Sequence, residues 1–259
     1  AFLCGVQRME NSGFWVSIIS HARPNNVRAM HRALENDLAT WYVGDDADET
    51  YGYRLAGANQ VVRAGSLMKA RNTALNDALR AGLPCIQLSD DLRRLAVAVS
   101  KDNKQNRPIT VIAAANAILQ SMHEVGAHYG GCAPTANAFF FNPEKPLTTD
   151  GFIVGDFTVY DAGAVDSSGK LLRFDEEMTL KEDYDFTCQN LAAFGVVARR
   201  NDILATFTHR TNAGGAVSYR TATEEQRNIC ILRNKWGDVV RPNPKRENEA
   251  VSYTHLTLP

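Results

Sequence analysis

Short apolar runs alternate with amphipathic segments over the first 90 residues of the chain. Residues 14–20, FWVSIIS, are apolar and partly β-branched, which predicts a buried strand. The turn cluster HARPNN follows it, and then a segment with apolar positions on one helix face: Val27, Met30, Ala33, Leu34 and Leu38. A second apolar run at residues 40–43 ends in the acidic sequence GDDAD. The pattern predicts a strand, a helix and a second strand.

A further unit of the same kind begins near residue 66. Ser66 is expected to cap a helix, and Gly82 and Pro84 are stop signals just beyond its end. The chain then enters the apolar run CIQL at residues 85–88. Three strand and helix units in about 90 residues predict an α/β fold with a parallel, nucleotide-binding half. The G-x-G-x-x-G fingerprint and the P-loop are both absent, so neither a dinucleotide dehydrogenase nor a P-loop NTPase is supported.

The later part of the chain predicts three more helices and four more strands. The helices are expected at residues 108–125, with Pro108 in the first turn, at 183–194, and at 223–235, where Thr223 and Gln226 form a capping box. The strands are expected at residues 138–141, 152–159, 196–199 and 203–208. No internal repeat interrupts this order.

Two adjacent carboxylates, Asp90 and Asp91, end the apolar run at residues 85–88. Open α/β sheets bind ligands beyond the carboxyl ends of their strands, so these acids are expected to face a ligand. Neighbouring carboxylates repel each other unless a cation lies beside them, and a divalent metal is the economical explanation. The alternative interpretation is a helix start with Ser89 or Asp90 as its N-cap.

The composition excludes several classes of protein. The chain has 259 residues, of which 44% are hydrophobic and 22% charged, enough for one large α/β domain. No run is long and apolar enough to span a membrane and no signal peptide is visible, which predicts a cytoplasmic protein. Five scattered cysteines without a CxxC pair indicate neither a zinc site nor a disulfide framework. We expect the terminal residues 251–259 to be a non-native or disordered tail.

Charge is unevenly distributed, although the formal net charge is only −1. Residues 150–185 contain ten acids and three bases, whereas residues 199–246 contain ten bases and four acids. An acidic segment followed by a basic one is typical of a catalytic rim beside a phosphate-binding surface. Solvated faces of an ordinary domain would give the same counts.

Five motifs occur in an order that resembles the GT-A glycosyltransferases: SHARPNN, ARNTALNDA, QLSDDLRR, LKEDYDF and HRTNAGG. Their details are most similar to the TET/JBP-associated glycosyltransferases, phage enzymes that modify hydroxymethylated pyrimidines in DNA. The resemblance implies a Rossmann-like sheet flanked by helices, in one domain over residues 1–250. It divides this domain into a nucleotide-sugar half at about 14–107 and an acceptor half at about 108–240. It also implies a reaction, the metal-dependent transfer of a sugar from a UDP-sugar to a hydroxyl group.

The same resemblance implies which residues hold the metal. The chain has SDD where the family has a DxD-type motif, so Ser89 stands at the first acidic position. This leaves Asp91, together with His209, as the expected ligands of Mn²⁺ or Mg²⁺, which would clamp the leaving diphosphate. Asp90 is then expected to contact the nucleotide sugar. A buried structural histidine remains an alternative for His209.

The remaining donor contacts are also carried over from the family. His21 and Arg23 are expected near the base and ribose, Asp45 near the pyrimidine edge and Arg71 near the phosphates. Arg71 also lies on a helix face that could simply be a surface. The Gly-rich loop after His209 is expected to close over the donor as a lid.

The acceptor side is expected to need a general base, and the resemblance implies Asp183 of the Glu182-Asp183 pair, with Asp185 as a further candidate. A helix N-cap at this position would be compatible with that role. The acceptor implied by the family is the 5-hydroxymethyl group of a modified pyrimidine in phage DNA. The basic segment at residues 199–246 is expected to contact the DNA phosphate backbone, with Arg227, Arg233 and Lys235 as its candidates. The alternatives are a saccharide or protein acceptor, a metal-dependent nucleotidyltransferase and a catalytically inactive nucleic-acid-binding module.

Overall fold

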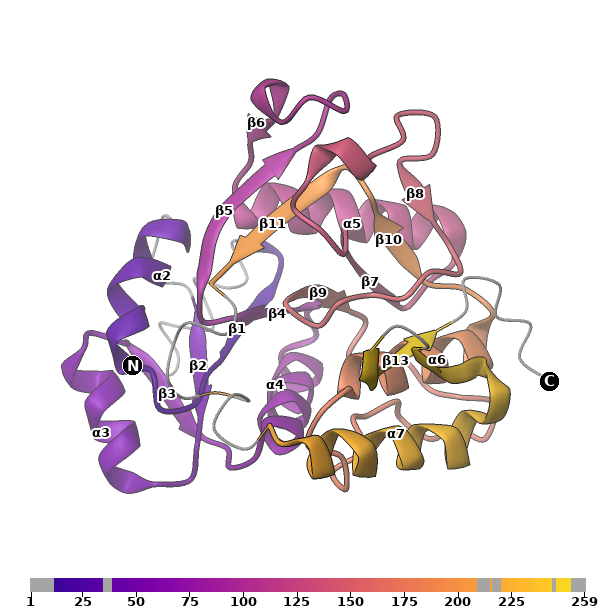
Figure 1. Cartoon of the computed structure of the whole chain (residues 1–259). Coiled ribbons are helices and arrows are strands. Elements are labelled where there is room, and N and C mark those ends of the chain that lie inside the picture. The colour runs from indigo at the N-terminus through magenta and orange to yellow at the C-terminus, as the bar shows by residue number, and fades with distance from the viewer. Residues whose placement is uncertain (1–11, 35–38, 209–214, 216–219, 244–245, 253–259) are drawn as a thin grey trace.

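The computed structural model describes residues 12–34, 39–208, 215, 220–243 and 246–252. Its first part is a parallel sheet built from strand and helix units, as the sequence predicts (Figure 1). The strands are β1 (Trp15–Ile19), β2 (Thr40–Val43), β3 (Gln60–Arg63) and β4 (Cys85–Ser89). The connecting helices are α2 (Val27–Leu34), α3 (Ala47–Leu55) and α4 (Leu67–Ala81). Strand β1 lies between β2 and β4 and is parallel to both.

The later strands extend this sheet with mixed polarity. They are β7 (Tyr129–Cys132), β8 (Leu147–Thr148), β9 (Phe157–Tyr160) and β10 (Ala198–Arg200). The order across the sheet is β3-β2-β1-β4-β9-β7-β10-β8, with β9 antiparallel to both β4 and β7. The fold is therefore α/β, with a mixed eight-stranded sheet flanked by helices.

Helices cover both faces of the large sheet. One buried apolar cluster contains residues of α2, α3 and α5 (Val111–Val125), and the other contains residues of α4, α6 (Glu182–Phe194) and α7 (Ala222–Trp236). Side chains of β1 divide between the two clusters, Val16 and Ile18 in one and Trp15 and Ile19 in the other. This alternation is the period of a strand that is buried on both faces.

Two smaller sheets complete the fold. One consists of β11 (Ile203–Phe207), β5 (Leu92–Val97) and β6 (Arg107–Pro108), and it lies above the large sheet in Figure 1. The other pairs β12 (Val240–Asn243) with β13 (Arg246–Ser252). Short 3₁₀ helices are η1 (Pro24–Asn26), η2 (Asn103–Gln105), η3 (Ala138–Phe140) and η5 (Gly237–Val239). In the described part of the chain, no helix is long and apolar enough to cross a membrane.

Several predicted boundaries are wrong. The strand expected at residues 138–141 is η3, because the Asn137 side chain accepts a hydrogen bond from the Phe139 backbone N–H and turns the chain. The strand expected at residues 152–159 begins only at Phe157. Helix α5 is capped by Thr110, so Pro108 precedes it in β6, and α7 is capped by Thr221 rather than by Thr223.

Candidate functional site

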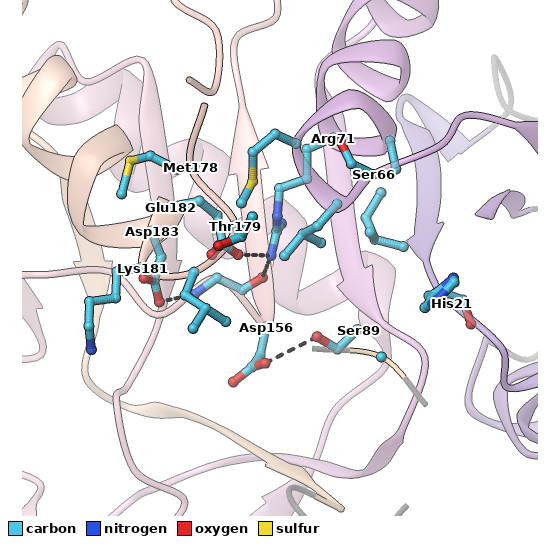
Figure 2. A pocket seen from close by; sticks show the side chains of 18 of the residues that line it. His21, Ser66, Arg71, Ser89, Asp156, Met178, Thr179, Lys181, Glu182 and Asp183 are labelled. Atoms are coloured by element: carbon cyan, nitrogen blue, oxygen red, sulfur yellow. Dashed lines mark hydrogen bonds and ion pairs between the residues drawn. The ribbon is translucent and has the colours of Figure 1, made fainter. Parts of the chain in front are cut away.

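A pocket of about 890 Å³ opens where β1 and β4 end. Residues that follow these two strands line it, together with the first turns of α4 and α6 and the residues just before β9 (Figure 2). Because β9 is antiparallel to β4, its first residues lie at the same edge of the sheet as the end of β4. The pocket is therefore at the carboxyl end of the parallel strands, where open α/β sheets bind ligands.

Asp90 and Asp91 form a tight turn between β4 and β5, so the helix start considered for this segment is wrong. The Asp90 carboxylate is buried and held by the protein. It accepts hydrogen bonds from Arg23 Nη1 at 3.1 Å, from Asn26 Nδ2 at 3.3 Å and from the Ser20 hydroxyl. Burial raises the pKa of Asp90, and the bonds from Ser20 and Arg23 oppose that change. Arg23 and Asp90 thus form one wall of the pocket as an ion pair whose carboxylate is buried.

Asp91 lines the pocket and is only 6% exposed. Within the described residues, its carboxylate makes no hydrogen bond or ion pair, while its backbone carbonyl accepts the Thr208 N–H at 3.2 Å. His209, its expected partner in metal binding, lies outside the described residues. No group of three or more His, Cys, Asp or Glu side chains in the described part of the chain is close enough to hold an ion. A nearly buried carboxylate without a partner among the described residues is nevertheless an oxygen donor of the kind that Mg²⁺ and Mn²⁺ bind.

Asp183 faces the same pocket from the first turn of α6. Its Oδ2 accepts the Gly155 N–H at 3.3 Å and its Oδ1 accepts the Tyr184 N–H at 3.0 Å. Loss of hydration and the charge of neighbouring Glu182 raise the pKa of Asp183 to about 7, against the opposing effects of Gly155 and Arg71. A carboxylate with this pKa is suited to accept a proton near neutral pH.

Arg71 lines the pocket and is 5% exposed. Its guanidinium is directed to protein groups, including Glu182 at 3.0 Å, rather than into open space (Figure 2). The surface position that the sequence left open for Arg71 is therefore wrong. A contact with a phosphate stays a prediction.

The other predicted donor residues are less enclosed. His21 lines the pocket, is half-exposed, and its Nδ1 lies 3.4 Å from Oε2 of Glu49. Asp45 is exposed, does not line the pocket, and its carbonyl accepts the Arg63 Nε–H at 2.9 Å. Gly215 is the one described residue of the expected lid loop, and its N–H donates to the His21 carbonyl at 2.9 Å.

Asp185 points away from the pocket. It is 1% exposed, and its Oδ1 lies 2.6 Å from Lys235 Nζ and accepts the Trp236 indole N–H at 2.8 Å. Lys235 also pairs with Asp175 at 3.0 Å. This geometry gives Asp185 a structural role between α6 and α7.

The expected DNA-contacting residues lie on α7. Arg227 is paired with Glu224 at 2.7 Å and donates to the Glu177 carbonyl at 2.8 Å. Arg233 is exposed. Because Arg227 and Lys235 are compensated by acids of the same chain, the local positive charge is smaller than a count of bases predicts.

Asp156 and Lys181 are two of the pocket residues that were not predicted as site residues. Asp156 precedes β9 and accepts the Ser89 hydroxyl at 3.1 Å, and no local sequence signal marks it. Lys181 has φ +62°, a left-handed conformation that is uncommon for a non-glycine residue, and its Nζ lies 2.7 Å from Oε2 of Glu225. Its place before the acidic first turn of α6 was the available signal.

No protein-family model matches the chain, and comparison with curated proteins finds no significant match. The function of the pocket is therefore inferred from its own residues.

Proposed function

We propose that the protein transfers a sugar from a nucleoside diphosphate sugar, a UDP-sugar, to a hydroxyl acceptor with the help of a divalent cation. The observation that carries this proposal is that one pocket contains two carboxylates in different environments. Asp91 is an unpartnered acid among the described residues at the end of β4, and Asp183 on α6 has a raised pKa. The first suits a cation and the second suits a proton.

The fold supports the donor side of this proposal. A parallel β3-β2-β1-β4 half with ligand-facing residues after β1 and β4 is the arrangement expected for a GT-A-type nucleotide site. The pocket volume of about 890 Å³ lies within the usual range for small-molecule sites. Arg23 and His21 at the β1 end would contact the nucleoside, and the Arg23–Asp90 ion pair holds that wall in place.

The chemistry requires charge stabilisation at the leaving group and proton removal at the acceptor. A bound Mg²⁺ or Mn²⁺ would neutralise the charge that develops on the diphosphate. Asp183 takes the proton from the acceptor hydroxyl as that oxygen bonds to the sugar carbon. The Gly155 N–H fixes one carboxylate oxygen of Asp183 during this step. The acceptor hydroxyl would therefore lie on the side of Asp183 that faces the pocket.

We propose a 5-hydroxymethylated pyrimidine of DNA as the acceptor. Reaching a pocket of this depth would require the base to leave the stack, at a cost of a few kcal/mol. Single-stranded DNA should then be used at least as well as duplex. Arg233 is the candidate for a contact with the DNA phosphate backbone, because Arg227 and Lys235 are engaged in ion pairs within the protein. A saccharide or protein acceptor would leave the donor chemistry unchanged.

The donor half of the proposal is tested without an acceptor. The protein is incubated with a panel of nucleotide sugars and Mn²⁺, and the slow hydrolysis products are identified by mass. Release of a nucleoside diphosphate and free sugar is expected. In a parallel incubation with a nucleoside triphosphate and a sugar phosphate, release of pyrophosphate would instead identify a nucleotidyltransferase. Absence of both reactions, with no nucleotide bound, would contradict the proposal.

A further inference from the structure

Gly155 lies between the guanidinium of Arg71 and the carboxylate of Asp183. Arg71 Nη2 donates to the Gly155 carbonyl at 3.0 Å, and the Gly155 N–H donates to Asp183 Oδ2 at 3.3 Å (Figure 2). The two hydrogen bonds use opposite sides of one residue. They connect a side chain of α4 to a side chain of α6 through the backbone segment that precedes β9.

A side chain at this position would crowd both Arg71 and Asp183. A Cβ on Gly155 would lie 2.9 Å from Arg71 Nη2 and 3.3 Å from the Asp183 Cβ. The first of these contacts is too short, so an alanine would push the guanidinium away from the backbone. The absence of a side chain at Gly155 therefore serves the close approach of Arg71 and Asp183.

The guanidinium of Arg71 is held in place by groups other than Gly155. Its Nη1 donates to Gln87 Oε1 at 3.0 Å, and Gln87 Nε2 returns a bond of 2.9 Å to the Arg71 carbonyl. Its Nη2 also pairs with Glu182 Oε1 at 3.0 Å, and its Cζ lies 5.3 Å from the centre of the Phe174 ring. Planar guanidinium groups suit such multiple, directional contacts, which a lysine cannot reproduce.

We propose that Arg71 is a positioning residue that fixes the carboxylate of Asp183 through Gly155, and that Glu182 is the counter-ion of Arg71 rather than a base. This inference rests on the proposed function, in which Asp183 accepts the proton. It assigns distinct roles to the two neighbouring acids. Glu182 is directed back to the guanidinium, whereas Asp183 is directed to Gly155 and the pocket.

The charges around Asp183 give this arrangement a measurable signature. Glu182 on α6 and Asp156 before β9 raise the pKa of Asp183, and Arg71 on α4 lowers it. Tyr129 on β7 also faces Asp183, and its hydroxyl is buried and neutral. Removing the charge of Glu182 should therefore lower the pKa of Asp183, whereas removing the charge of Arg71 should raise it.

The experiment is a carboxyl ¹³C NMR titration of the full chain labelled at its aspartates. The Asp183 resonance is assigned by its absence from the spectrum of Asp183→Asn. Glu182→Gln is expected to move the Asp183 midpoint to lower pH and Arg71→Met to higher pH. Arg80→Met, which removes an exposed cation from the same helix, should leave the midpoint unchanged. Unchanged midpoints in both Glu182→Gln and Arg71→Met would overturn the inference.

A second variant keeps the test valid if Arg71→Met does not fold. Gly155→Ala changes no charge and is expected to lower kcat by about 10²-fold with little change in KM, because the base is displaced while the donor site is kept. The matched control is Gly163→Ala, whose Cβ would make only ordinary contacts at 3.5 Å. Wild-type kcat in Gly155→Ala would also overturn the inference.

The outcomes separate this inference from the proposed function. Opposite midpoint shifts without sugar transfer by the wild type would retain the Arg71–Gly155–Asp183 arrangement and remove the proposed reaction. Sugar transfer by the wild type, with midpoints and kcat insensitive to these variants, would retain the reaction and remove the arrangement.

Discussion

The Ser89 hydroxyl donates a hydrogen bond of 3.1 Å to Asp156 Oδ1, and the Ser89 N–H donates one of 2.8 Å to the Asp156 carbonyl. These bonds join the end of β4 to the residue that precedes β9. They hold Asp156 against Ser89 at the edge of the sheet where the pocket opens. Serine at position 89 is thus the neutral partner of an acid supplied by the neighbouring strand.

Replacing Ser89 with an acid should therefore destabilise the protein. Ser89→Asp would place two carboxylates against each other in a half-buried site, and they would repel when ionised. We expect Ser89→Asp to melt below Ser89→Asn at pH 8, and the difference to shrink as the pH falls and the carboxyl groups take up protons. Thermal unfolding of the two variants at several pH values measures this. An equal Tm for both at pH 8 would show that Asp156 does not face position 89.

Asp91 should couple nucleotide binding to the metal. The carboxylate of Asp91 has no partner among the described residues. A cation and a diphosphate that share this site are therefore expected to bind more tightly together than either binds alone. UDP is expected to raise Tm strongly only with Mn²⁺ or Mg²⁺, as a ligand at about 100 times its Kd stabilises by roughly 2.7 kcal/mol. Asp91→Asn should remove this coupling. The metal role is contradicted by an equal UDP shift in EDTA.

Asp183 should control the acid side of the pH profile. With a pKa of about 7, its carboxyl group is protonated below that pH and cannot accept a proton. Turnover is expected to fall as the pH drops through about 7, and Asp183→Asn should lower kcat by about 10²–10⁴-fold with donor binding retained. Steady-state rates from pH 5 to 9 measure both effects. A pH-independent rate, or normal turnover in Asp183→Asn, would assign the proton transfer to another group.

The same pKa has a consequence for stability. Asp183 binds its proton more tightly in the folded chain than in the unfolded chain, where the usual value is 3.8. Its contribution to stability therefore decreases as the pH rises from about 4 to about 7. Asp183→Asn should gain stability relative to the wild type at pH 8 and not at pH 4. A variant that unfolds more readily at pH 8 would show that the carboxylate is better accommodated than its surroundings indicate.

Much of the fold and part of the site follow from local patterns. The strands that hold the pocket are short apolar runs, and Asp91 and Asp183 stand at a strand end and a helix start, which local patterning locates well. Asp156 could not be located this way, because its place depends on the pairing of β9 with β4, some 70 residues earlier in the chain. Long-range pairing is not written in a local pattern.

The structure places Asp185 and Lys235 differently from the prediction, for physical reasons as well. Asp185 is two residues from Asp183, and a helix turns by about 200° over two residues, so the two acids point to opposite sides of α6. Lys235 forms an ion pair with Asp175, an acid distant in the sequence, and a count of charges along the chain does not reveal that pair. The first difference follows from helix geometry, and the second from tertiary packing.

Lys235 should act mainly on stability. Lys235→Met would leave the buried Asp185 without its cation, at a cost of about 3 kcal/mol, the lower end for a buried pair because Lys235 is partly exposed. Tm should fall by roughly 2–4 °C per kcal/mol for a chain of this size. Arg233→Met, at an exposed position one turn or less away, is the control and should change stability by less than about 0.5 kcal/mol. If Lys235→Met instead keeps its Tm and loses DNA affinity, the lysine belongs to a DNA surface.

The most direct test of the proposed reaction is the mass of the nucleosides recovered from hydroxymethylcytosine-containing DNA after incubation with UDP-sugars and Mn²⁺. The wild type is expected to add the mass of one sugar residue to the modified nucleoside, with release of UDP, on single-stranded DNA at least as well as on duplex. Asp91→Asn and Asp183→Asn should abolish or strongly slow the addition. Unmodified nucleosides with the wild type and every donor, or equal addition by Asp183→Asn, would contradict it.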